Sequence, residues 1–129
     1  MEPVYTIQYG LGVQEDSLKI YPDRVLIQKP KERKSSAMDV IKKELRMQGL
    51  MKTEYIGIDV PFSKIDSIYL KPATSIVFKN GLIVFYLKDR GKNDVNWFNY
   101  EKTANAMHFW SEDNETAQKI KDYVERNKN

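Results

Sequence analysis

Short runs of alternating or continuous apolar residues recur along the chain, and they predict short β-strands. Turn residues separate several of these runs. Pro22-Asp23 predicts a hairpin between the second and third runs, and Asn80-Gly81 predicts another between the sixth and seventh. The eight candidate runs, which predict about seven strands, are residues 4–9, 17–21, 24–28, 54–60, 66–71, 75–78, 82–87 and 106–110.

Two segments instead repeat their apolar residues at the spacing of an α-helix. The first is an inserted helix at about residues 36–48, and the second is a C-terminal helix at about residues 112–127. Ser111 is expected to cap the second helix, and acidic residues follow in its first turn, where the helix dipole favours them. The face expected to dock on the strands carries Ala117, Ile120 and Val124.

This order of elements predicts an α+β fold. Many short strands separated by turns favour a rolled or sandwiched antiparallel sheet, and a single terminal amphipathic helix suits one open end of it. Strands and helices do not alternate along the chain, so a Rossmann-like parallel sheet is disfavoured. Residues 82–87 lack polar alternation, so both faces of that strand are expected to be covered. A length of 129 residues is typical of one domain, here residues 1–129.

Four stretches in this order resemble small bacterial pleckstrin-homology-like (PH-like) domains, which often lie beside a short C-terminal helical segment. The resemblance implies a PH-like roll of about seven antiparallel strands in two sheets, capped by the C-terminal helix. It implies no catalytic residue, and some members form rings or edge-paired oligomers. The inserted helix 36–48 and a long loop at 89–105 depart from the family pattern. The matching stretches are residues 17–25, 60–68 with 71–73, 80–85, and 105–109 followed by 117–121.

Composition excludes several classes of chemistry. The chain has no cysteine, which rules out disulfides, thiolate nucleophiles and cysteine-ligated metals. His108 is the single histidine, and it is expected on the exposed face of its strand rather than in a metal site. Gly10-Leu11-Gly12 lacks the third glycine of a dinucleotide-binding loop and predicts a turn. We therefore expect no enzyme activity, no metal and no cofactor.

Positive charge is concentrated in residues 29–52, which hold eight Lys and Arg against three Asp and Glu. Such a segment predicts an anionic partner, and peripheral binding to an anionic membrane or another polyanion is the alternative function. The same charges are also typical of a solvated loop and helix face. Nucleic acid is disfavoured because stacking aromatics are not interleaved with the charges. The candidate anion-binding residues are Lys29, Lys31, Arg33, Lys34, Lys42, Lys43 and Arg46.

Trp97, Phe98 and Tyr100 are the candidate protein-interaction residues because they lie in a polar loop with little apolar cover. They are equally suited to folding back over the sheets. The leading prediction is a non-catalytic PH-like protein-binding or assembly module whose partner is another protein or a second copy of the chain. An exposed sheet edge also serves such a role. Without a secretory signal or membrane-spanning run, a cytoplasmic location is expected.

Overall fold

The N-terminal strands form a four-stranded antiparallel sheet. The computed structural model describes residues 2–10, 15–30, 55–74, 80–88 and 103–128. Neighbouring strands of this sheet are consecutive in the sequence, in the order β1-β2-β3-β4, and a two-residue turn at Pro22-Asp23 joins β2 to β3 as the sequence predicted. The strands are β1 (Tyr5–Tyr9), β2 (Asp16–Ile20), β3 (Arg24–Pro30) and β4 (Tyr55–Pro61).

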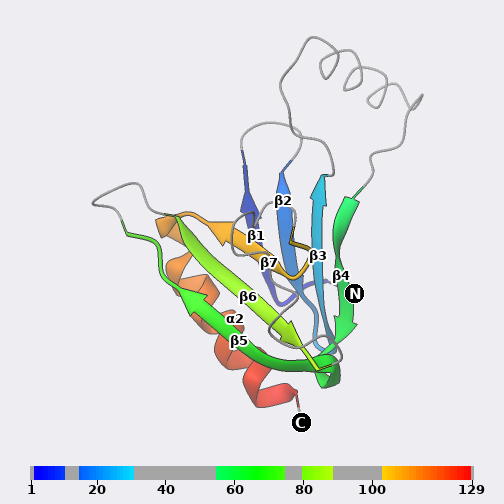
Figure 1. Cartoon of the computed structure of the whole chain (residues 1–129). Helices are drawn as coiled ribbons and strands as arrows, with labels where there is room; N and C mark the ends of the chain where they lie inside the picture. Colours follow the sequence, from blue (N-terminus) through cyan, green and yellow to red (C-terminus); the bar gives the residue numbers. More distant parts are fainter. Residues whose placement is uncertain (1, 11–14, 31–54, 75–79, 89–102, 129) are drawn as a thin grey trace, which may run out of the picture.

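The one-turn 3-10 helix η1 (Phe62–Lys64) leads into a three-stranded antiparallel sheet with the order β5-β6-β7. Its strands are β5 (Ile65–Lys71), β6 (Gly81–Leu87) and β7 (Ala106–Phe109). Figure 1 shows this sheet crossing the first one obliquely. β6 pairs with β5 on one side and β7 on the other. The strand that precedes residues 82–87 and pairs with them is β5, whereas the strand predicted at 75–78 as their hairpin partner lies outside the described residues.

Both faces of β6 are covered, as its missing alternation predicted. All seven of its residues are buried. One face joins the main core, and the other forms a second apolar cluster. Burial, together with the nearby Tyr69, raises the pKa of the Tyr86 phenol on that outer face. The second cluster comprises Leu82, Val84, Tyr86 and Ala106.

The C-terminal helix α2 (Asn114–Asn127) follows a 3-10 turn, η4 (Ser111–Asp113). The predicted Ser111 cap is wrong, because this extra turn makes Asp113 the N-cap residue of α2, and Asp113 makes no side-chain capping hydrogen bond. Partial burial and the adjacent Glu112 raise the pKa of the Asp113 carboxyl. The acidic residues do lie at the start of the helical region, as expected from the helix dipole.

The core lies between the two sheets and α2, which runs beside β5 in Figure 1. The predicted helix face is confirmed, since Ala117, Ile120 and Val124 are fully buried. Tyr123 completes the contact edge-on against Tyr5 and Phe62, with ring centroids 5.7 and 6.0 Å away. A row of side chains in register across the first sheet faces them, namely Ile7, Leu18, Ile27 and Ile58.

Two antiparallel sheets of four and three strands with one C-terminal helix confirm the α+β class. The inserted helix predicted at 36–48 lies outside the described residues, as does most of the loop predicted at 89–105.

The ladder between β3 and β4 requires glycine at position 57. A Cβ atom there would overlap the carbonyl oxygen of Ile27 on the neighbouring strand. We expect Gly57→Ala to lower the free energy of unfolding by about 1–3 kcal/mol, because the strands must shift to admit the methyl group. Urea denaturation measures this. Gln28→Ala, which alters the residue opposite Gly57, is the control and should change stability by no more than about 0.5 kcal/mol. Equal stabilities of the two variants would contradict this account.

Candidate functional site

The edges of the two sheets are the first places to search for a site. An edge strand presents backbone N–H and C=O groups that need partners, and it is a ready template for another strand. In the described part of the chain the edge strands are β1 and β4 in the first sheet and β5 and β7 in the second. The contacts that the described residues make differ from one edge to another.

The edges of β1 and β7 face each other at one corner of the structure. Tyr9, at the end of β1, packs against Trp110, which follows β7, with ring centroids 5.2 Å apart. The Tyr9 hydroxyl accepts a hydrogen bond from the Asn80 side chain. These side-chain contacts fill the corner and bring the two edges against each other at this end.

His108 belongs to the same corner. Its Nδ1 lies 3.2 Å from the carbonyl oxygen of Gly81, and its ring centroid is 5.9 Å from that of Tyr9. Because a carbonyl only accepts, Nδ1 carries the proton of this hydrogen bond. The sequence predicted an exposed histidine, but His108 is half-buried. Alternation along β7 could not predict the partial burial of His108, because the residue that covers it, Tyr9, comes from the other sheet.

Residues of α2 occupy the edge of β5 and its continuation. The Asn114 side-chain amide makes two hydrogen bonds to Ala73, accepting from its N–H at 2.7 Å and donating to its carbonyl at 2.9 Å. This pairing imitates a neighbouring strand. At the other end of β5, the Lys128 ammonium donates to the carbonyl of Asp66 at 2.7 Å. Asn114 of the helix and Lys128, which follows it, therefore bond to backbone groups at both ends of this edge.

The edge of β4 is different. Two hydrogen bonds fix which of its backbone groups face β3: Tyr21 N–H donates to Arg24 O at 2.9 Å, and Phe62 N–H donates to Asp23 O at 3.2 Å. Backbone direction alternates along an antiparallel strand. With the observed register, the even-numbered positions 56, 58 and 60 therefore bond to β3. The backbone groups of Tyr55, Gly57 and Asp59 point away from the sheet, and no strand pairs with them among the residues that the structure describes.

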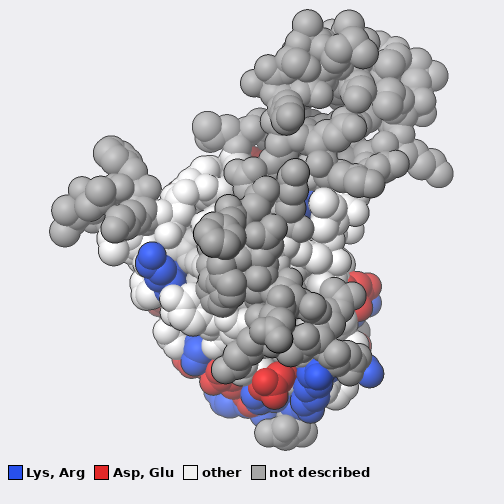
Figure 2. Space-filling model, in the orientation of Figure 1, with Lys and Arg blue, Asp and Glu red and all other residues white. Residues whose placement is uncertain are grey.

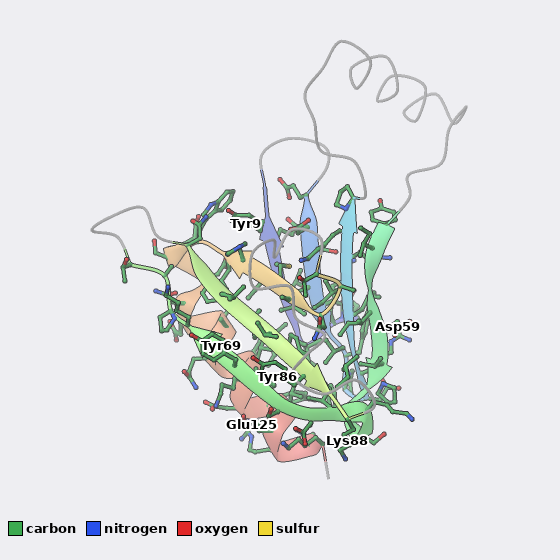
Figure 3. The ribbon with its side chains drawn as sticks, in the orientation of Figure 1. Tyr9, Asp59, Tyr69, Tyr86, Lys88 and Glu125 are labelled. Atoms are coloured by element: carbon green, nitrogen blue, oxygen red, sulfur yellow. The ribbon has the colours of Figure 1, made fainter. Side chains whose placement is uncertain are left out.

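The side chains beside this edge are exposed. Tyr55 is 54% exposed, and the Asp59 side chain is 56% exposed. Asp59 projects from the outer margin of β4 in Figure 3 and makes an ion pair with Arg24 at 3.6 Å. Ile58, between them, points into the core and is 7% exposed. We define Tyr55, Gly57 and Asp59 as the β4 edge. It offers backbone donors and acceptors next to one aromatic ring and one carboxylate.

Lys29 does not lie on an anion-binding surface. It is 1% exposed, and its ammonium donates to the carbonyl of Thr103 at 2.8 Å. The expectation that it binds an external anion is therefore at odds with its position inside the molecule. The sequence held a signal that could have shown this, because Lys29 is in phase with the buried Val25 and Ile27 of the same strand.

Lys29 belongs to a polar layer inside one end of the first sheet. Asp16 is 3% exposed and faces the same side, on the strand beside it. Next to the second sheet, Asn105 donates through its side-chain amide to the Phe85 carbonyl at 2.8 Å, while Phe85 N–H donates to Asn105 O. These bonds hold residues 103–105 against both sheets, so their role is to position the start of β7.

The remaining sequence candidates are not placed by the structure. Trp97, Phe98 and Tyr100 lie outside the described residues, so their protein-interaction role stays a prediction. The same holds for the other candidate anion-binding residues, which are Lys31, Arg33, Lys34, Lys42, Lys43 and Arg46.

An open groove between β1 and α2 is lined by side chains of both charges. In Figure 2 acidic and basic atoms also intermingle over the lower end of the molecule. Opposite charges at one surface favour no single class of charged ligand. Among the described residues, the groove therefore defines no site as distinct as the β4 edge. Its lining residues are Tyr5, Lys119, Asp122, Glu125 and Arg126.

No family model, curated protein or solved structure matches this chain. Within the described residues, every helix is too short or too polar to cross a bilayer.

We expect Lys29→Ala to lower the free energy of unfolding by about 2–4 kcal/mol, because it leaves a cavity and removes a buried hydrogen bond to the Thr103 carbonyl. Thermal and urea denaturation measure this loss. Lys19→Ala, on the opposite face of the neighbouring strand, is the matched control and should cost no more than about 0.5 kcal/mol. A Lys29 variant as stable as the Lys19 variant would refute a structural role for the buried ammonium.

Asn114→Ala should remove both hydrogen bonds to Ala73 and open that end of the β5 edge. We expect the Ala73 amide proton to exchange with solvent at least tenfold faster and the free energy of unfolding to fall by about 1–3 kcal/mol. Hydrogen exchange followed by NMR gives the first quantity. Gln118→Ala on the same helix, whose side chain bonds only Asp122 in the described residues, should leave the Ala73 rate unchanged. Unchanged exchange in Asn114→Ala would contradict the strand-like role of this amide.

Proposed function

We propose that this chain is a non-catalytic PH-like protein-interaction module that takes up an extended segment of a partner protein along the β4 edge. The observation that carries the proposal is the difference between the four sheet edges. β1 and β7 lie against each other at one corner, and Asn114 of α2 and Lys128, which follows α2, bond to backbone groups at the two ends of β5. The outward backbone groups of β4 have no such cover among the described residues.

Edge pairing suits this surface on physical grounds. An added strand satisfies the outward N–H and C=O groups in the same geometry as the rest of the sheet. Each backbone hydrogen bond contributes about 0.5–1.5 kcal/mol net, so several of them provide useful affinity without a deep pocket. Proteins normally block long edges because these lead to aggregation. Among the described residues, β4 is the edge strand for which neither a facing strand nor the C-terminal helix supplies contacts, and this supports a binding role.

The PH-like assignment is supported by the strand order of the two sheets and by the helix that follows the last strand. The sequence resemblance implies the same arrangement, with some members that pair through sheet edges. The described polar side chains with the most buried hydrogen bonds also bind backbone groups of this chain, as Lys29 and Asn105 do. Such bonds are typical of structural residues and support a non-catalytic module.

Proline at position 59 tests the proposal. It removes the outward N–H of Asp59 while sparing the N–H groups that β3 uses, and edge strands tolerate proline at such positions. Partners captured from cells by the wild-type chain and cross-linked to β4 should be lost with Asp59→Pro. Asp59→Ala, which removes the same carboxylate but keeps the N–H, should retain most of the binding. Cross-links that map to another surface, or a folded Asp59→Pro variant that binds normally, would overturn the proposal.

A further inference from the structure

We infer that the segment bound by the β4 edge is an antiparallel strand with the pattern basic-x-aromatic. Its basic residue lies opposite Asp59, and its aromatic residue lies opposite Gly57. This inference rests on the proposed function and adds the chemistry of the partner. It follows from the backbone direction of β4 and from the side chains that flank its outward groups.

The backbone sets the spacing. Tyr55, Gly57 and Asp59 direct both N–H and C=O outward, so an antiparallel strand forms its closely spaced pairs of hydrogen bonds at these residues. Partner residues opposite Gly57 and Asp59 are thus two apart. Because the strands run in opposite directions, the residue opposite Asp59 comes first in the partner. The residue between them lies opposite Ile58 and faces the core side, where an apolar side chain is favoured.

Gly57 sets the aromatic position. It leaves a gap on the solvent face between Tyr55 and Asp59, and β4 cannot fill this gap itself because a Cβ atom would overlap the Ile27 carbonyl. An incoming strand can therefore supply a side chain that covers the exposed glycine backbone from the open side of β4. Aromatic residues opposite edge glycines stabilise sheets in this manner.

Asp59 sets the charge. Its carboxylate is largely exposed, and the side chain of its partner Arg24 is itself 42% exposed, so their ion pair at 3.6 Å is weak in water. A cation directly opposite on a neighbouring strand stands about 5 Å away between Cβ atoms and is favourable. A second copy of β4 fits less well, since that strand contains no Lys or Arg and therefore places no cation opposite Asp59 in any register.

A labelled peptide tests this pattern. In acetyl-Thr-Lys-Val-Tyr-Ile-Thr-amide, Lys meets Asp59 and Tyr meets Gly57, and fluorescence anisotropy gives its Kd. Three altered peptides carry Glu for Lys, Ser for Tyr, or an N-methyl group on the Tyr amide. We expect each to bind about five- to tenfold more weakly, since each loses one contact of about 1 kcal/mol. Equal binding of the N-methyl peptide would overturn the inference.

A charge exchange locates the contact. Asp59→Lys should reverse the preference, so that the Glu peptide binds more tightly than the Lys peptide. Asp66→Lys is the matched control, because it makes the same change on an exposed residue of β5, whose edge Lys128 partly covers. It should leave the original preference intact. Thermal melts establish that both variants are folded, and an unreversed preference in folded Asp59→Lys would overturn the inference.

The test separates this inference from the proposed function. If Asp59→Pro abolishes partner capture but the peptides show no preference, the edge is used and the basic-x-aromatic pattern is wrong. If light scattering shows a dimer that Asp59→Pro dissociates, a second copy occupies the edge and the pattern is equally wrong. If Asp59→Pro has no effect on capture, the proposed function itself fails.

Discussion

The need to satisfy backbone hydrogen bonds at the sheet edges constrains the whole structure. The described strands form two sheets with four edges, and tertiary contacts reach three of them: β1 meets β7, and Asn114 of α2 bonds to the continuation of β5. The same helix that seals the core with Ile120 and Val124 also supplies Asn114 as a substitute strand partner. One element thus contributes both to closing the core and to protecting the β5 edge, whereas no such contact reaches β4 among the described residues.

Polar residues inside the molecule also satisfy backbone hydrogen-bonding groups. The Lys29 ammonium donates to the Thr103 carbonyl, and the Asn105 side chain donates to the Phe85 carbonyl. These bonds connect the segment before β7 to both sheets. This segment brings β7 to β1 and therefore closes the corner around Tyr9. Burial of a lysine carries a large desolvation cost, and the bond to Thr103 offsets part of it. The Lys29 ammonium is thus buried and bonded to a backbone group of the same chain.

Local patterns predicted most of what the structure describes. Alternation located both hairpin strands around Pro22-Asp23, and the spacing of Ala117, Ile120 and Val124 predicted the docking face of α2. The failures came where a residue's environment is set by a distant partner. Ser111 lost its capping role to an extra 3-10 turn, and His108 is covered from another sheet. The β4 edge was foreseen only as some exposed edge, since strand order is not encoded in alternation.

The sequence by itself determined the element types, their order and the absence of cysteine chemistry, because these depend on periodicity and composition. It also located the excess positive charge, although it misjudged Lys29. The tertiary structure decided which strands pair, which edges α2 covers, and which backbone groups of β4 face outward. These properties arise from contacts between residues far apart in the chain, such as Ala73 with Asn114. A local pattern carries no information on such pairings until the fold brings the residues together.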